Sequence, residues 1–422
     1  MLHKKKLAFV ILLLFLGARG SFAGPEGSVY GVRRLSLDEV LSRLLQDHTS
    51  IRKALIGVAK AQELKKAGTA GAFPEITADA YSAFATGETQ GLVYSDVTLR
   101  LPLFSGGKYR EERRLRDEEI ELQKLRVEEA RLLLALEVRK MYYGLLEEKE
   151  LIRLARDLSI ELREHAESMR LLFEREAITK LELLGAESLL AWSKHSLVEH
   201  KEKSDYWLSV LKRLLELGED VRIEFLPVTG LPEPPYLSAE EFDSALTQSP
   251  SLRMGEHTVR ARKHEEKILK ATRWPEISFS SRYNRDRDVF VDTNRFMVGL
   301  EGRMTLWDFG RTAHEIRAKA YEVEEARLEL KLEAERKEQQ IRRLLAAMRT
   351  LHEEIRLRKA EMIEHREAYR NDRAALTAGE KGKTGALPAA LNLYGAQERY
   401  LKVVTAYRVR YAEFLYETGI SS

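Results

Sequence analysis

The chain has 422 residues with 70 Lys and Arg against 67 Asp and Glu, and it contains no cysteine. Without cysteine there is no disulfide, no thiolate metal site and no lipid-carrying cysteine, which excludes a lipoprotein anchor. Four of the basic residues lie in the first 23, so the remainder has 66 basic against 67 acidic residues, a balance that gives a nucleic-acid partner no electrostatic support.

Residues 1–23 have the three-part layout of a secretory signal peptide, with basic residues at 3–6, an apolar run at 7–16 and small residues at the end. The apolar run is too short to span a bilayer comfortably. We therefore expect the mature chain to begin near Gly24, outside the cytoplasm. No later apolar run approaches the length of a transmembrane helix, but membrane β-strands alternate and would leave only a weak hydropathy trace.

The rest of the sequence consists of two similar halves. LSLDE at 35–39 returns as LSAEE at 237–241, and FPEI at 73–76 returns as WPEI at 274–277. LFSGGK at 103–108 is matched by LWDFGR at 306–311. Because the offset drifts by only two residues, these matches indicate an internal duplication. The sequence predicts one repeat at 24–220, a proline-rich linker at 221–236 and a second repeat at 237–422.

Each repeat contains a predicted pair of strands in which apolar and polar residues alternate. The expected strands are at about 76–86, 92–104, 277–287 and 295–307. A soluble sheet gives the same alternation, but strands of this length also suit a tilted membrane strand. Aromatic residues stand at the same end of all four strands, as in an interfacial girdle, namely Phe73, Phe104, Trp274 and Trp307.

The polar side of these strands is the candidate lumen of a water-filled conduit, with a solvated sheet face as the alternative. Its residues are Tyr94, Asp96, Thr98, Arg100, Ser278, Ser280, Arg282, Glu301, Arg303 and Thr305. Four strands cannot close a barrel in lipid, where open edges leave backbone groups unsatisfied. The chain must therefore form oligomers if the strands span a membrane, and a trimer would supply twelve strands.

A long helix follows each strand pair. The stretch from Gly310 to Gly379 contains no internal proline or glycine, and in the first repeat Leu151, Leu154 and Leu158 recur at coiled-coil spacing. Such a helix is on the order of 100 Å long. A returning helix follows a break near 177–179 and, in the second repeat, near 379–382. Helix length alone fits a dimeric coiled-coil strut equally well.

This order of helix, FPEI, strand pair, LFSGGK and long helix, all repeated, resembles the TolC-like outer-membrane efflux proteins. The resemblance implies a mainly α fold with a membrane β-barrel: a duplicated helix-strand-strand-helix-helix unit, whose trimer forms a twelve-stranded barrel continued by a long α-helical coiled-coil tunnel. It also implies that the tunnel narrows where the long helices turn back.

The candidate entrance or adaptor-docking residues at those turns are Ala177, Ile178, Thr179, Lys180, Glu182, Gly379, Glu380, Lys381, Lys383 and Asn392. In the second repeat the offset is ambiguous by seven residues, and Asn392 stands where the resemblance leads us to expect an acid. An acidic gate is therefore not carried over to this chain. A solvated flexible turn is the alternative interpretation of the basic, glycine-rich segment.

We therefore expect an outer-membrane channel, the exit duct of an efflux or type I secretion system, that extends into the periplasm and is not lipid-anchored. The expected partners are two further copies of the chain, a periplasmic adaptor, an inner-membrane transporter and outer-membrane lipid. No catalytic residue, cofactor or metal is expected, because ten scattered histidines form no ligand cluster and the carboxylates alternate with basic residues at helical spacing. The competing hypothesis is a soluble periplasmic coiled-coil scaffold or adaptor.

Overall fold

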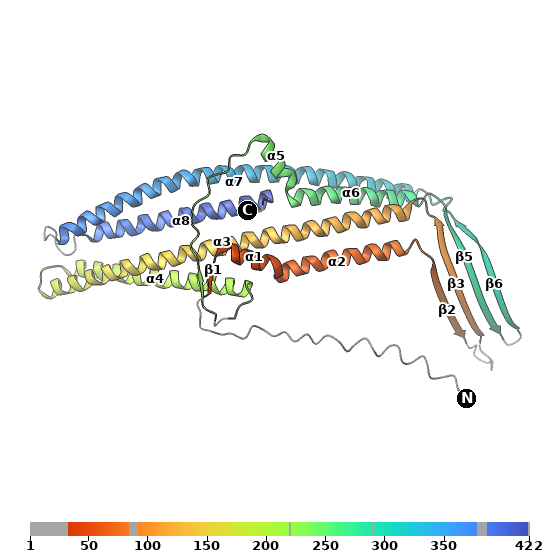
Figure 1. Ribbon diagram of the computed structural model, residues 1–422, viewed down its shortest axis with the longest axis horizontal. Coiled ribbons are helices and arrows are strands. Elements are labelled where there is room, and N and C mark those ends of the chain that lie inside the picture. The colour runs from red at the N-terminus through yellow and green to blue at the C-terminus, as the bar shows by residue number, and fades with distance from the viewer. Residues whose placement is uncertain (1–32, 84–91, 219–220, 289–290, 378–385, 421–422) are drawn as a thin grey trace, which may run out of the picture.

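A computed structural model of the chain describes residues 33–83, 92–218, 221–288, 291–377 and 386–420. The predicted signal peptide lies outside the described residues. Figure 1 shows an elongated molecule with the strands of the long sheet at one end and the far ends of the long helices at the other. The short elements and the end of the last helix lie midway along its length. The fold is thus a rod of helices with a sheet at one end.

The helices and strands follow one another in the predicted order. They are β1 (Arg33–Leu35), α1 (Leu37–Asp47), α2 (Thr49–Ala70), β2 (Glu75–Ala83), β3 (Leu92–Phe104), α3 (Lys108–Glu174), α4 (Lys180–Leu214), β4 (Ile223–Phe225), α5 (Ala239–Gln248), α6 (Pro250–Ala271), β5 (Glu276–Asp288), β6 (Val291–Arg303), α7 (Arg311–Thr377) and α8 (Leu387–Thr418). The helix before each hairpin is divided in two, since the backbone of His48 is extended, that of Ser249 is not helical, and Pro250 starts a new helix.

The duplication is visible in the lengths of the helices. α2 and α6 each have 22 residues, and α3 and α7 each have 67. The repeated LSLDE and LSAEE motifs are capping boxes, in which Ser36 exchanges hydrogen bonds with Glu39 at the start of α1 and Ser238 does so with Glu241 at the start of α5. The motifs recur because each repeat must begin a helix at the same place.

The two longest helices are continuous because their sequences hold strong helix formers and apolar residues at spacings of three and four. At about 1.5 Å per residue, each spans about 100 Å. Leu151, Leu154, Leu158 and Leu162 are all buried on α3 where it packs against α4 and α8. In the described part of the chain, no helix has a stretch apolar enough to cross a membrane.

The four long strands form one antiparallel sheet in the order β2-β3-β5-β6. The two hairpins are joined through β3 and β5, and one irregularity lies between Pro102 and Phe104. Strands β2 and β6 are the edges, and each pairs with only one neighbour within the chain. The sheet therefore ends in two open edges that a further strand could extend.

Among the described residues, the largest cluster of buried apolar side chains lies midway along the rod, where α1, α3 and α4 meet the parallel pair formed by β1 and β4. Tyr142 of α3 is fully buried there, and its ring meets Phe225 edge to face at 5.4 Å. Its hydroxyl donates to the carbonyl oxygen of Leu226 at 2.7 Å. This contact ties the linker segment between the repeats to the first long helix.

Candidate functional site

The sheet has one apolar face, and that face is exposed within the chain. Its residues include Ile76, Val97, Phe296, Val298 and Leu300, and the Leu300 side chain is 71% exposed. Their cross-strand partners extend this apolar face, since Ile76 pairs with Leu99 and Phe279 pairs with Leu300. A contiguous apolar surface of this kind marks contact with lipid or with another protein.

The opposite face of the sheet is polar, as the alternation predicts. Nine of the ten candidate lumen residues lie on it, because the register pairs Thr98 with Arg282, Arg100 with Ser280 and Ser278 with Glu301. Thr305 lies two residues beyond the end of β6 and outside the sheet. The two faces are therefore as distinct in the structure as in the sequence, and the lumenal role of the polar one stays a prediction.

The middle of this polar face carries a hydrogen-bonded group. Thr98 Oγ1 donates to Asp96 Oδ2 at 2.9 Å, and Arg282 Nε donates to Thr98 Oγ1 at 3.2 Å. Arg282 Nε also lies 3.6 Å from Asp96 Oδ2. Asp96 is buried by these neighbours although it stands on an outer face of the sheet. The charges on this face are thus held in position by cross-strand contacts.

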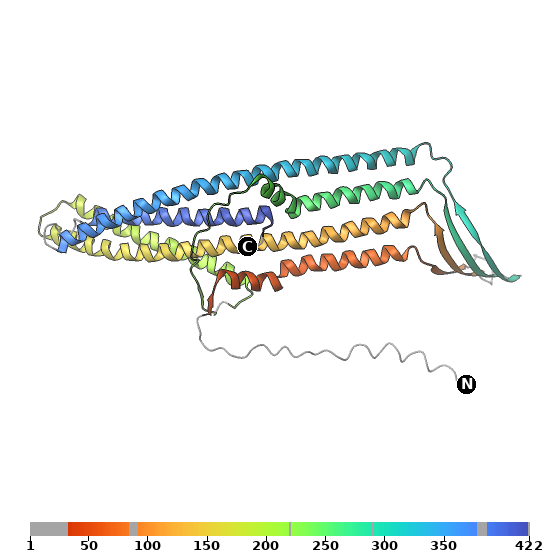
Figure 2. The same cartoon turned by 45° about the horizontal axis from the view of Figure 1, so that its top comes forward.

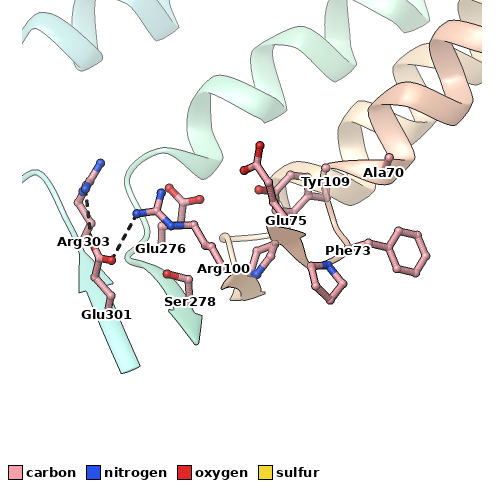
Figure 3. Close-up of a pocket in the computed structure, with 12 residues that line it drawn as sticks. Ala70, Phe73, Glu75, Arg100, Tyr109, Glu276, Ser278, Glu301 and Arg303 are labelled. Carbon is pink, nitrogen blue, oxygen red and sulfur yellow. Dashed lines mark hydrogen bonds and ion pairs between the residues drawn. The ribbon is translucent and has the colours of Figure 1, made fainter. Parts of the chain in front are cut away.

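A cavity of about 490 Å³ lies where the polar face meets the helices. Its charged lining consists of Glu75, Arg100, Glu276, Glu301 and Arg303, which Figure 3 shows together. The register repeats one pairing, since Glu75 faces Arg100 in the first hairpin and Glu276 faces Arg303 in the second. No carboxylate corresponds to Glu301 in the first hairpin. The Glu301 carboxylate lies 3.4 Å from the Arg100 guanidinium and 3.2 Å from the Arg303 guanidinium.

The five charged residues that line this cavity therefore form a charged band, with three carboxylates and two guanidinium groups. At neutral pH its five groups carry a net charge of about −1. Tyr109, at the start of α3, also lines it, and burial together with the carboxylates of Glu276 and Glu112 raises the pKa of its hydroxyl. Arg100, Glu301 and Arg303 were predicted from the sequence, whereas Glu75 and Glu276 were not, although their place directly after the FP and WP motifs marks both.

The four predicted interfacial aromatics gather at the helical end of the sheet, and all four are exposed. Phe73 and Trp274 precede β2 and β5, Phe104 ends β3, and Trp307 follows β6. Phe309, which is 90% exposed, stacks edge to face on Trp307 at 5.9 Å and was not among the predicted residues. Their contact with the lipid interface stays a prediction.

At the other end of the rod, the turn between α3 and α4 contains Ala177 and Ile178, followed by a capping box. Thr179 Oγ1 donates to the Glu182 carboxylate at 2.8 Å, and the backbone N–H of Thr179 donates to it at 2.7 Å. That backbone hydrogen bond lowers the pKa of Glu182. Thr179 and Glu182 thus start α4, a local structural role that the sequence analysis did not separate from an entrance role.

The remaining entrance candidates are only partly described. Lys180 is the first residue of α4, and Asn392 is exposed on α8. Gly379, Glu380, Lys381 and Lys383 lie outside the described residues. The structure therefore leaves the role of the second turn a prediction.

A contact near these turns joins the two long helices and was missed from the sequence. The Tyr369 hydroxyl of α7 donates to the Glu161 carboxylate of α3, and Arg373 lies over the Tyr369 ring. Burial, followed by the neighbouring Glu161 carboxylate, raises the pKa of Tyr369 to about 12. The 208-residue separation matches no repeat offset. Nothing in the sequence indicated this contact, because it depends on which helices lie side by side.

Three histidines pair with glutamates of α3 and thus have structural partners. His264 Nδ1 lies 2.8 Å from Glu111 Oε2 and His257 Nδ1 lies 2.6 Å from Glu118 Oε2, both across the α3–α6 contact. His200 of α4 pairs with another α3 glutamate in the same way, at 2.7 Å. Within the described ranges, no three His, Asp or Glu side chains lie close enough together to hold a metal ion.

Comparisons with known proteins cover both repeats. The family model described as outer membrane efflux protein matches residues 40–214 and 242–414. Among solved structures, the Campylobacter jejuni CmeC outer membrane channel is similar, with a TM-score of 0.78 and 17% identity, over 91% of this chain and 85% of that one. No curated protein sequence matches.

Two further solved structures have the same fold. The open state of the Neisseria gonorrhoeae MtrE outer membrane channel has a TM-score of 0.76 at 17% identity, over 91% of this chain and 88% of that one. The outer membrane protein VceC from Vibrio cholerae has a TM-score of 0.73 at 14% identity, over 91% and 96%. At these identities the likeness concerns the fold.

Proposed function

The chain belongs to the outer membrane efflux protein family, and we propose that three copies of it assemble into one exit duct. As a member of this family the protein is an outer-membrane efflux channel and not an enzyme. Each copy contributes one sheet with two open edges, β2 and β6. Pairing β6 of each copy with β2 of the next closes twelve strands into a barrel, which satisfies the backbone groups that lipid would leave unpaired.

The observation that carries this proposal is the polarity of the sheet. Its exposed apolar face suits lipid, and its polar face suits a water-filled lumen. In the barrel, the nine polar-face residues of each copy line the channel. The charged band at the base of the sheet becomes a ring at the junction between barrel and helical tunnel. A soluble scaffold would leave the same apolar face in water without any compensating contact.

We also propose that the turns at 177–182 and 379–392 form the periplasmic entrance and the docking end for an adaptor. Members of this family act together with periplasmic adaptors and inner-membrane pumps. Two turns per chain in a trimer would present six docking sites around the entrance. Because the chain contains no cysteine, it has no residue for a lipid anchor, and the barrel alone would hold it in the outer membrane.

Membrane extraction and a single substitution on each face test the channel proposal. The mature protein should require detergent for extraction, run as a heat-labile trimer and form ion-conducting pores in planar bilayers. Val298→Arg, on the apolar face near the middle of β6, should reduce trimer yield sharply, because a charge at the middle of the lipid face costs about 2–4 kcal/mol per chain. The matched control Ser280→Arg lies on the polar face of the adjacent strand and should assemble normally.

Recovery of the mature chain in the soluble periplasmic fraction would refute the channel and favour the scaffold. Equal tolerance of arginine on both faces would refute the assignment of lipid and lumen. Loss of the gene should sensitise cells to small toxic compounds if the duct serves efflux. Loss of a secreted protein without such sensitisation would favour type I secretion instead.

A further inference from the structure

The contact between α3 and α6 is an antiparallel seam inside one chain, and it joins the two repeats. Two polar layers lie on it, Glu111 with His264 and Glu118 with His257. The spacing is seven residues on both helices, so the layers follow a heptad register. Glu111 is 5% exposed, which shows how closely the helices cover this seam.

The duplication relates this seam to two uncovered helix faces. α7 repeats α3 at an offset of 203, with the same 67 residues, and α2 repeats α6 at an offset of 201, with the same 22. Figure 2 shows α3 and α6 side by side, with α2 on the outer side of α3 and α7 on the outer side of α6. The face with which α3 meets α6 is therefore repeated on α7, and its complement is repeated on α2.

The exposed fractions of corresponding residues support this relation between the seam and the two uncovered faces. Leu125 of α3 is 2% exposed, whereas Leu328, its counterpart on α7, is 55% exposed. Tyr321, the counterpart of Glu118, is 75% exposed. Ile56, the counterpart of His257, is 68% exposed on α2. Large apolar side chains thus occupy seam positions that nothing in the single chain covers, which indicates a missing helix partner.

We propose that α7 of one copy packs against α2 of the next in the register of the internal seam. In one of the two polar layers the histidine then lies on the long helix and the glutamate on the short one, the reverse of the internal seam. His314 occupies the α7 position that corresponds to Glu111, and Glu63 occupies the α2 position that corresponds to His264. The histidine and glutamate of this layer have thus exchanged helices. The second layer becomes an apolar contact between Tyr321 and Ile56. This inference rests on the proposed trimer and specifies the contact that would hold it together.

A reversed pair keeps one histidine and one glutamate in contact, so the layer retains its hydrogen bond while the neighbouring layer gains apolar burial. Such a polar layer flanked by apolar ones fixes the register of a helical contact. The seam must be wider near the sheet, because Phe309 stands at the position of Gly106, where a Cβ would come within 2.7 Å of the Ala271 carbonyl oxygen. The contact is therefore closest around the two layers.

Disulfide trapping tests the register, since the natural chain has no cysteine to interfere. Under oxidation, the double variant Ile56→Cys/Tyr321→Cys should form covalent dimers and trimers that disappear on reduction. In the matched control Ile56→Cys/Leu328→Cys the second cysteine is one heptad away, about 10 Å along the helix. That distance is too long for a disulfide to bridge, so no covalent dimers or trimers should form. Glu118→Cys/His257→Cys should cross-link within one chain only.

A charge exchange tests the reversed pair. His314→Glu places two carboxylates in the layer and should lower the temperature at which the trimer dissociates. His314→Glu/Glu63→His rebuilds the orientation of the internal pair and should restore that temperature. His195→Glu, on an exposed position of α4, is the matched control and should have no effect. Failure of the double variant to restore the trimer would refute the reversed pair.

The outcomes separate this inference from the proposed function. A trimer by native mass in which the control pair cross-links, or in which neither interchain pair does, overturns the register and leaves the channel intact. A protein that is monomeric by native mass and also yields no interchain cross-link overturns the trimer itself.

Discussion

Removing the unmatched carboxylate of the charged band should measurably weaken the cation preference of the channel. The band holds Glu75, Glu276 and Glu301 against Arg100 and Arg303. Glu301→Gln removes one negative charge per chain and three per trimer. The substitution keeps the size of the side chain, and the glutamine amide can still accept from the neighbouring guanidinium groups, so the barrel should assemble.

The size of the effect follows from the geometry of a twelve-stranded barrel. Strands about 4.8 Å apart and tilted by about 40° close at a radius of about 12 Å. Three charges at that distance from the axis, in water, contribute about 1 kcal/mol before screening. A Debye length of about 10 Å at 0.1 M salt reduces this to about 0.3 kcal/mol, favourable for a monovalent cation and unfavourable for an anion. The ratio of cation to anion permeability should fall about threefold.

Reversal potentials in planar bilayers under a salt gradient measure this ratio. The change should reach about tenfold near 0.01 M salt, where the Debye length is about 30 Å, and vanish near 1 M. Glu301→Asp keeps the charge and is the matched control, so its permeability ratio should stay that of the natural protein. An unchanged ratio for Glu301→Gln at 0.01 M salt would show that Glu301 does not face the conducting lumen.

Three further predictions concern stability and mobility. Tyr142→Phe leaves the partly buried Leu226 carbonyl without its hydroxyl donor, so the free energy of unfolding should fall by about 0.5–1.5 kcal/mol, measured by denaturant titration in detergent; an unchanged value would argue against the tie to the linker. Tyr369→Phe removes the hydrogen bond to Glu161, and hydrogen exchange should rise at the turn-proximal ends of α3 and α7, with no change at the sheet; protection equal to that of the natural protein would contradict this. Burial acts to raise the pKa of Glu111, but its hydrogen bond and neighbouring positive charges hold that pKa below its ordinary value of 4.5. The stabilisation from Glu111 is therefore complete above pH 4.5 and is lost as the pH falls through the lowered pKa, so Glu111→Gln should flatten the acid side of the stability profile, and an unaltered profile would refute the linkage.

Local patterns in the sequence account for much of this fold. Alternation with period two separates Thr98 and Arg282 from Val97 and Leu300, and the structure has these pairs on opposite faces of one sheet. Leucines at spacings of three and four predict the buried side of α3. The family match confirms the predicted outer membrane efflux protein resemblance. Each of these features is carried by residues close together in the chain.

Contacts between distant helices could not be read in the same way. Glu161 and Glu111 look alike in the sequence, as charged residues on a long helix, yet one binds Tyr369 of α7 and the other His264 of α6. Glu182, an entrance candidate, is also the capping partner of Thr179, and its entrance role stays a prediction. Its capping motif was readable in the sequence, whereas the two interhelical partners were not.

The sequence by itself determined the repeat, the two faces of each strand and the length of the rods, because all three follow from periodicities of two, about 3.6 and about 200 residues. Only the tertiary structure decided which helices are neighbours. It brought α3 beside α6, left one face of α2 and one face of α7 uncovered, and gathered the carboxylates of both hairpins into one cavity. Periodicity specifies which side of an element is buried, but the partner is chosen by packing among elements far apart in the chain.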